Sequence, residues 1–235
     1  MSTIDGVNMN RIDKIVEFVD ENKIVADIGS DHGITAIKIY EEKKPKKVIA
    51  TDISKESLQK LVDKLQHSRY DIETIVTDGI RDLPKNIDEI IISGMGGYLI
   101  SKIIKNGIDV AKSADKLILQ ANNSLDHLRK FLHSEGFEII DEANVYEENY
   151  IYTIIVTKYT NQVNKYYNND YYIYGKKNIE NKDELTIKYI ERELNHSKTV
   201  INNIKSNDTI VVKNRIKELE DKINCMENLL CKLKS

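Results

Sequence analysis

The chain contains few of the residues that cross-link a protein or interrupt its helices. Its 235 residues include two cysteines, two prolines and no tryptophan. Cys225 and Cys231 are too few for a disulfide framework, so we expect a reduced, cytoplasmic protein. No apolar run approaches the roughly 18 residues that cross a bilayer. The first residues also lack the basic and apolar stretches of a secretory signal, and we expect no membrane partner.

A large excess of charge of either sign is absent as well. The net charge is -3, which excludes a uniformly basic nucleic-acid binder but not a locally basic one. Residues 1–159 carry 27 acidic and 21 basic side chains, whereas residues 160–235 carry 14 basic and 11 acidic ones. The mild positive balance of the second part is compatible with a phosphate-bearing partner, although lysines on a solvated helix face are its commoner cause.

Short apolar runs alternate with amphipathic segments in the first part. This alternation predicts an α/β fold with a doubly wound, mostly parallel sheet. Two last runs follow each other without a helix between them, which predicts an antiparallel pair. A hairpin added to such a sheet favours the Rossmann-like seven-stranded fold of class I methyltransferases. The expected strands are 24–29, 47–52, 72–78, 88–94, 116–122, 137–146 and 150–159, and the expected helices between them include 34–41, 54–66, 98–107 and 125–136.

The composition changes near Tyr159, where we place the boundary between a domain of residues 1–159 and a second of residues 160–235. A polar, tyrosine-rich linker comes first. Two helical patterns follow, and the second has apolar residues at the a and d positions of a heptad from Ile216 to Leu233. The pair predicts a C-terminal α-helical antiparallel coiled-coil domain. A dimerising zipper is the alternative, but so short a seam is readily satisfied within one chain, so we favour a monomer.

Acidic residues end three successive predicted strands. Asp27 opens the loop Asp-Ile-Gly-Ser-Asp-His-Gly, Asp52 lies nineteen residues beyond Gly33, and Asp78 ends the third strand. Since ligands of open α/β sheets bind at the carboxyl ends of the strands, this pattern predicts an adenosine-containing ligand there. An acid about 20 residues after the glycine loop is placed to accept hydrogen bonds from ribose hydroxyls. A helix cap or a turn is the alternative role for each acid taken singly.

The loop distinguishes two adenosine cofactors. A dinucleotide site needs G-x-G-x-x-G to admit a pyrophosphate, whereas this loop reads D-x-G-x-D-H-G. The carboxylate of Asp31 would repel a pyrophosphate but is compatible with a sulfonium and an ammonium group. We therefore favour S-adenosylmethionine over NAD as the cofactor.

The fourth and fifth predicted strands also end in unusual residues. Ser-Gly-Met-Gly-Gly at 93–97 predicts backbone exposed to a ligand. Met95 either packs against a base or fills a core gap, and Asn122 either binds a base edge or caps the next helix. His32 is a candidate general base or a structural hydrogen-bonding residue. The chain has no His/Cys/Asp spacing typical of a metal site, so we expect no metal.

In these motifs the sequence resembles the bacterial TrmK-type tRNA methyltransferases, which methylate N1 of the adenine at position 22 of tRNA. The resemblance extends over about residues 10–205 and is most specific at the segments DIGSDHG and SGMGG. It implies a Rossmann-like methyltransferase domain, a coiled-coil domain, S-adenosyl-L-methionine as cofactor and tRNA as partner. One departure is Ala121, where the family usually has proline, and this change affects the rigidity of the loop rather than a functional group.

From the motifs and the resemblance together we predict three sets of site residues. Our catalytic hypothesis is that Asp31 accepts a hydrogen bond from the exocyclic amine of adenine. The alternatives are a methyltransferase of a small metabolite and a non-catalytic S-adenosylmethionine-binding scaffold. The predicted cofactor-binding residues are Asp27, Gly29, Ser30, His32, Gly33, Asp52, Ile53, Asp78, Gly79, Gly94, Met95 and Gly96; the catalytic candidates are Asp31, His32 and Met95; and the substrate-binding candidates are Arg11 and Asn122.

Overall fold

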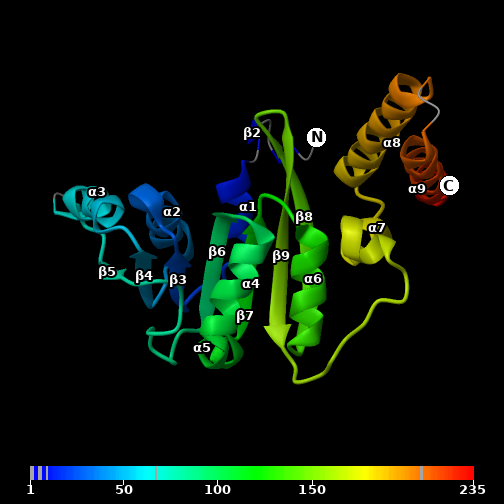
Figure 1. Ribbon diagram of the computed structural model, residues 1–235. Coiled ribbons are helices and arrows are strands. Elements are labelled where there is room, and N and C mark those ends of the chain that lie inside the picture. Colours follow the sequence, from blue (N-terminus) through cyan, green and yellow to red (C-terminus); the bar gives the residue numbers. More distant parts are fainter. Residues whose placement is uncertain (1–2, 5–6, 9, 67, 207–208) are drawn as a thin grey trace. The chain divides into compact units, whose positions relative to one another are not determined.

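A seven-stranded sheet forms the frame of the larger part of the chain in the computed structural model (Figure 1). Its strand order is β5-β4-β3-β6-β7-β9-β8, in which β9 runs antiparallel to both neighbours and the other adjacent pairs are parallel. This order confirms the predicted doubly wound sheet with a terminal hairpin. The strands are β3 (Ile24–Ile28), β4 (Lys47–Asp52), β5 (Ile72–Val76), β6 (Glu89–Met95), β7 (Lys116–Ala121), β8 (Phe137–Glu147) and β9 (Tyr150–Tyr159).

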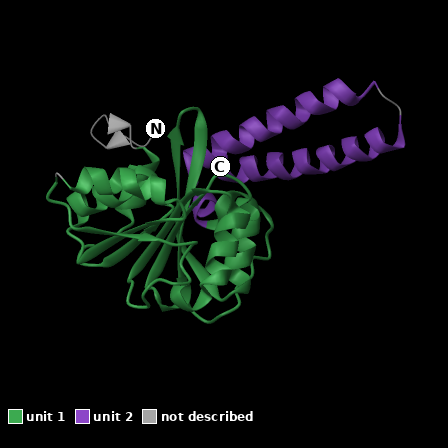
Figure 2. Ribbon diagram, turned by 60° about the vertical axis from the view of Figure 1, so that its left-hand side comes forward, with its two compact units in different colours: residues 1–176 green, residues 177–235 purple. Residues whose placement is uncertain are grey.

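The structure describes residues 3–4, 7–8, 10–66, 68–206 and 209–235. Contacts divide the chain into two compact units, residues 1–176 and residues 177–235, which Figure 2 shows in different colours. Within the described residues, no helix offers an apolar stretch long enough for a membrane span. Two short strands that the sequence did not predict, β1 (Thr3–Ile4) and β2 (Val7–Asn8), form a separate antiparallel pair.

Helices cover both faces of the sheet, and the alternation of side chains along each strand explains why. On β6, Ile90 and Ile92 belong to one core while Ile91 belongs to the other, and all three are fully buried. Strands buried on both faces read as continuous apolar runs, as the sequence showed. One core includes α4 (Gly97–Asn106), α5 (Ile108–Ser113) and α6 (Leu125–Ser134), and the other includes α1 (Arg11–Glu17), α2 (Ile34–Lys43) and α3 (Lys55–Leu65).

The caps of the helices agree well with the sequence pattern. The Ser54 side chain accepts a hydrogen bond from the backbone of Ser57 at the start of α3, as predicted. Gly107 ends α4, but a further helix, α5, begins directly after it and was not predicted. Six residues are too few to show a clear apolar period, which explains the omission.

The segment 160–176 packs with the first unit, so the compact units divide later than the predicted boundary after Tyr159. Arg129 on α6 is fully buried and donates from Nη1 to the carbonyl oxygen of Tyr172 at 2.7 Å. Its Nε donates to Oε1 of Glu142 on β8 at 2.6 Å. The ring of Tyr172 is buried in turn. A buried arginine therefore holds the segment 160–176 on the first unit. Because this segment has no periodic pattern of its own, the sequence analysis assigned it to the second part.

The second unit contains two long helices, α8 (Glu184–Ile204) and α9 (Ile210–Lys234), that run side by side (Figure 2). It also holds most of α7 (Lys176–Glu180). The predicted seam is buried at Leu219, Met226, Leu230 and Leu233. Ion pairs join the two helices, among them Lys198 with Glu227 at 2.7 Å. These features confirm the predicted helical hairpin; its Cys225 and Cys231 are free and exposed.

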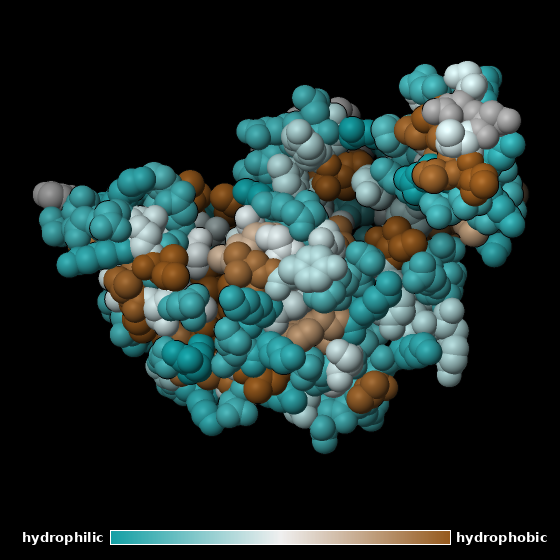
Figure 3. Space-filling model, viewed as in Figure 1, coloured by the Kyte–Doolittle hydropathy of each residue, from teal (hydrophilic) through white to brown (hydrophobic). Residues whose placement is uncertain are grey.

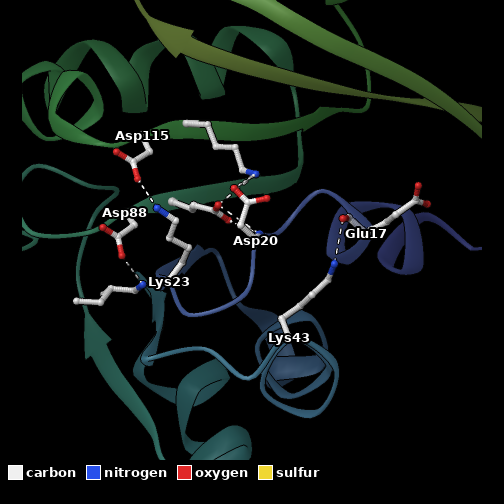
Figure 4. A network of polar contacts seen from close by, with 9 residues as sticks. Glu17, Asp20, Lys23, Lys43, Asp88 and Asp115 are labelled. Atoms are coloured by element: carbon white, nitrogen blue, oxygen red, sulfur yellow. Dashed lines mark hydrogen bonds and ion pairs between the residues drawn. The ribbon is translucent and has the colours of Figure 1, made fainter.

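Ion pairs and hydrogen bonds tie together the amino ends of the central strands (Figure 4). Lys23 Nζ lies 2.7 Å from Oδ2 of Asp115, and Oδ2 of Asp88 accepts a hydrogen bond from the backbone of Ile24. Glu89 is fully buried with Lys116 Nζ at 3.1 Å, and burial raises the pKa of Glu89 to about 7. At this end of the sheet, the charged side chains pair with one another or with the backbone.

Most of the face seen in Figure 3 is hydrophilic, with hydrophobic residues in separate groups. The large apolar side chains that are exposed come from distant parts of the sequence, for example Ile53, Val163 and Ile210. Scattered exposed apolar residues are ordinary for a folded chain.

We predict that Arg129→Ala destabilises the first unit by about 3–5 kcal/mol, because Glu142 would remain buried without its cation. Chemical denaturation would measure the loss, and hydrogen exchange should increase in residues 160–176. Lys102→Ala, at an exposed position of α4, is the matched control and should change the unfolding free energy by less than about 1 kcal/mol. An Arg129→Ala protein as stable as this control would contradict the assignment.

Candidate active site

The loop after β3 is fixed by the carboxylate of Asp27. This side chain is buried, and its Oδ2 accepts a hydrogen bond from Ser30 Oγ at 2.5 Å. The backbone of Ser30 also donates to the carbonyl oxygen of Thr51 on β4 at 2.8 Å. Burial raises the pKa of Asp27 to about 6. Gly29 turns the loop with a φ of 73°, as predicted for a tight turn.

The loop continues into two consecutive left-handed residues, His32 and Gly33. A Cβ on Gly33 would lie 2.3 Å from Cδ1 of Leu61 on α3, which confirms the predicted close packing at the helix start. Two lysines of α3 reach the loop. Lys64 Nζ donates to the carbonyl oxygen of His32 at 2.9 Å, and Lys60 Nζ lies 3.4 Å from His32 Nε2. His32 thus has hydrogen-bonding partners close by. This agrees with the structural role that we considered for it as the alternative to a general base.

The next two acids lie at the carboxyl ends of β4 and β5. Asp52 is partly exposed, and its Oδ1 accepts a hydrogen bond from the backbone of Ser54 at 2.8 Å. Its neighbour Ile53 is 69% exposed, so an apolar side chain faces solvent beside this carboxylate. Asp78 is exposed and Gly79 is buried with a φ of 81°. Register pairs Asp27 with Ala50 and Asp52 with Val76, so the carboxyl ends of these strands form one edge.

The tip of β6 approaches the loop after β3. A Cβ on Gly29 would lie 2.3 Å from Cε of Met95, so the thioether occupies the space beside that glycine. Gly94 has a φ of 76°, is exposed, and has no atom within 4 Å of the position its Cβ would take. Gly94 thus provides open backbone, as predicted for this strand tip. Met95 also packs on the core beneath it, which is the structural role considered for it.

The other two glycines of this segment have a packing role. A Cβ on Gly97 would lie 2.5 Å from the carbonyl oxygen of Ser124, and one on Gly96 would lie 3.2 Å from Asn123 Oδ1. The backbone of Gly97 donates to the carbonyl oxygen of Asn123 at 3.1 Å. The starts of α4 and α6 are therefore held together directly beside the open strand tip.

Gln120 connects the two predicted substrate-binding residues and was not predicted as a site residue. It is fully buried, and its Oε1 accepts hydrogen bonds from the backbone of Gly94 at 3.0 Å and from Arg11 Nη1 at 3.3 Å. Its Nε2 donates to Asn122 Oδ1 at 3.1 Å, and Asn122 Nδ2 donates to the carbonyl oxygen of Gly94 at 2.8 Å. The Arg11 guanidinium lies over the Tyr152 ring at 4.9 Å. A buried amide at a strand end was the sequence signal that could have revealed Gln120.

Asp31 lies on the open side of this arrangement. Its side chain is 63% exposed, and Oδ1 lies 3.5 Å from His32 Nε2. Its backbone is held by a hydrogen bond to the carbonyl oxygen of Gly29 at 2.8 Å. The carboxylate is therefore accessible to a ligand at a fixed position of the loop. Across the described residues, no three His, Cys, Asp or Glu side chains come together as a metal site would require.

We predict that Gly33→Ala destabilises the protein more than Gly94→Ala. Both positions have a left-handed φ, which costs an alanine about 1–2 kcal/mol. Only at Gly33 does the new methyl meet a fully buried side chain, Leu61, which adds about 1–3 kcal/mol. Urea denaturation of the two variants measures the difference. Equal decreases in the free energy of unfolding would show that the Leu61 side chain can move aside at little cost and that the packing does not require glycine at position 33.

Comparisons with known proteins agree with this geometry. The profile of the family described as "Methyltransferase domain" matches residues 8–155. The tRNA (adenine(22)-N(1))-methyltransferase of Bacillus subtilis is 26% identical over 227 residues, covering 94% of this chain and 95% of that protein. An uncharacterised protein from Listeria monocytogenes superposes with a TM-score of 0.86 at 26% identity, covering 94% of this chain and 98% of that one. M. capricolum TrmK, solved with S-adenosyl-homocysteine, has the same fold, with a TM-score of 0.79 at 24% identity over 95% of this chain and 97% of that one.

The Bacillus subtilis and M. capricolum relatives confirm the resemblance to the TrmK-type proteins that the motifs indicated. The family profile spans the strands and loops from α1 to β9, including the glycine loop, the tip of β6 and the Gln120 network. On the evidence of this match and of the seven-stranded sheet that it spans, the chain belongs to the methyltransferase-domain family.

Proposed function

We propose that this protein transfers a methyl group from S-adenosylmethionine to N1 of the adenine at position 22 of tRNA. The observation that carries the proposal is the carboxyl edge of the sheet. There the acid-containing glycine loop contacts Met95 at the tip of β6, beside the exposed backbone of Gly94, which Gln120 and Asn122 hold. The Bacillus subtilis relative of nearly equal length, whose name states this activity, supports the choice of substrate. A tRNA substrate also fits the expected cytoplasmic location.

The residues at this edge fit S-adenosylmethionine. Gly94 presents backbone without a neighbouring side chain, and the partly exposed carboxylate of Asp52 is available to ribose hydroxyls. Asp78 and the exposed side chain of Ile53 would border the adenine moiety. Asp27 stabilises the loop, since its carboxylate already accepts a hydrogen bond from Ser30. When bound, the cofactor supplies an electrophilic methyl group on a sulfonium centre.

Neutral N1 of adenine carries a lone pair in the ring plane, so the chain does not need a strong base. Its task is to orient N1, which contributes up to about 7–11 kcal/mol for well-aligned reactants. It must also balance the positive charge that the base acquires. Asp31 is the candidate for both tasks, because its exposed carboxylate can accept a hydrogen bond from the exocyclic amine. Asn122 is held by two hydrogen bonds beside Gly94 and is a second candidate for contacting the base.

The target nitrogen lies on the Watson–Crick edge, so the adenine must leave its stack at a cost of a few kcal/mol. Arg11 is positioned by Glu147, whose Oε2 accepts a hydrogen bond from its backbone at 2.8 Å, and by the Tyr152 ring. We assign its guanidinium to the substrate side of the site. The lysines and arginines of the helical second unit would supply further contacts to tRNA phosphates.

The proposal predicts that labelled S-adenosylmethionine and unmodified tRNA yield 1-methyladenine at position 22 and at no other adenine. Methylation of a small metabolite without RNA, or cofactor binding without transfer to any RNA, would refute it. Asp31→Ala should lower turnover about 100-fold at saturating substrates while leaving cofactor affinity within about threefold. Asp71→Ala, which removes an exposed acid beside the amino end of β5, should retain full activity. Near-normal turnover of Asp31→Ala would exclude the role of that carboxylate.

A further inference from the structure

Two aromatic rings stack on each other beside the proposed site. The rings of Tyr98 and His127 have centroids 3.9 Å apart and planes that differ by 25°. Neither Tyr98 nor His127 is among the residues that we assign to the cofactor or to the target adenine. Tyr98 is the second residue of α4 and His127 the third residue of α6.

The pair lies on the first turns of the two helices that start at the carboxyl edge. α4 and α6 pack against each other on the same face of the sheet (Figure 1). The hydrogen bond from the backbone of Gly97 to the carbonyl oxygen of Asn123 holds these helix starts together. Gly97 precedes Tyr98 directly, and Asn123 follows Asn122. Tyr98 comes four residues after Gly94 and His127 five residues after Asn122, so the stacked rings stand on the helix starts that follow these two site residues.

The tyrosine ring is available to a ligand. Tyr98 is 65% exposed although His127 covers one of its faces. A pair that served only to pack α4 against α6 would be expected to lie in the core, where Ile100 of α4 and Leu128 of α6 are both fully buried. His127 also limits the positions that the tyrosine ring can take. The result is a flat aromatic surface with a fixed orientation.

We infer that Tyr98, supported by His127, stacks against the base of a nucleotide that neighbours the methylated adenine in the RNA. This inference rests on the proposed function. When the adenine leaves its stack, its neighbour loses a stacking partner, and an aromatic side chain replaces that partner. Stacking of this kind tolerates any base, since every base has a π-face. Tyr98 is thus a substrate-positioning residue.

Steady-state methylation of an unmodified tRNA transcript tests the inference. Tyr98→Ala should raise the KM for tRNA about 5- to 100-fold, because one base–aromatic stack is lost. Tyr98→Phe keeps the ring and should restore the wild-type KM to within about twofold. His127→Ala should give an intermediate increase. Cofactor affinity and the melting temperature should not change in the two Tyr98 variants, since Tyr98 is exposed. Tyr167→Ala, at a tyrosine that is 99% exposed and outside the carboxyl edge, is the control and should behave as wild type.

The outcomes separate this inference from the proposed function. If the wild-type chain does not methylate tRNA, the proposed function fails. If the wild-type chain methylates tRNA and Tyr98→Ala has an unchanged KM, the function stands and the stacking role is wrong. The stacking role is also wrong if Tyr98→Phe is as impaired as Tyr98→Ala, because then the hydroxyl and not the ring would matter.

Discussion

The buried carboxylate of Asp27 is the constraint on which the site depends. Its Oδ2 accepts a hydrogen bond from Ser30 Oγ, and the backbone of Ser30 donates to the carbonyl oxygen of Thr51 on β4, so two contacts hold the loop after β3 at Ser30. Within that loop, Gly29 can face Met95 and Asp31 can face solvent. An acid at this place costs desolvation, which is visible in the raised pKa of Asp27. The hydrogen bond from Ser30 offsets part of this cost and at the same time ties the carboxylate to the loop.

The two ends of the sheet have opposite characters. At the amino ends, charges such as Lys116 and Glu89 satisfy one another and leave little for a ligand. At the carboxyl ends, Asp31 and Asp78 are exposed, Asp52 is partly exposed, and Gly94 exposes backbone. This asymmetry follows from the direction of the parallel strands, which brings all the loops that precede α2, α3 and α4 to one edge.

Much of this arrangement could be predicted from the sequence, because the signals are local. Continuous apolar runs predicted the strands that are buried on both faces of the sheet. Gly29 and Gly33 predicted the turn after β3, and their positive φ values confirm it. Features that depend on tertiary contacts could not be predicted. Gln120 is recognisable in the sequence as a polar residue at a strand end, but only the fold brings Arg11, more than a hundred positions away, beside it. Arg129 likewise gives no sign in the sequence that it holds Tyr172 and so extends the first unit to residue 176.

Hydrogen–deuterium exchange with and without S-adenosylmethionine tests the central claim most directly, which is that the carboxyl edge of the sheet is the ligand site. The account predicts added protection in residues 27–33, 52–54 and 93–97, where backbone amides line that edge. It predicts no change in residues 86–89 and 115–117, at the amino edge. Protection confined to the amino edge, or none at saturating cofactor, would contradict the account.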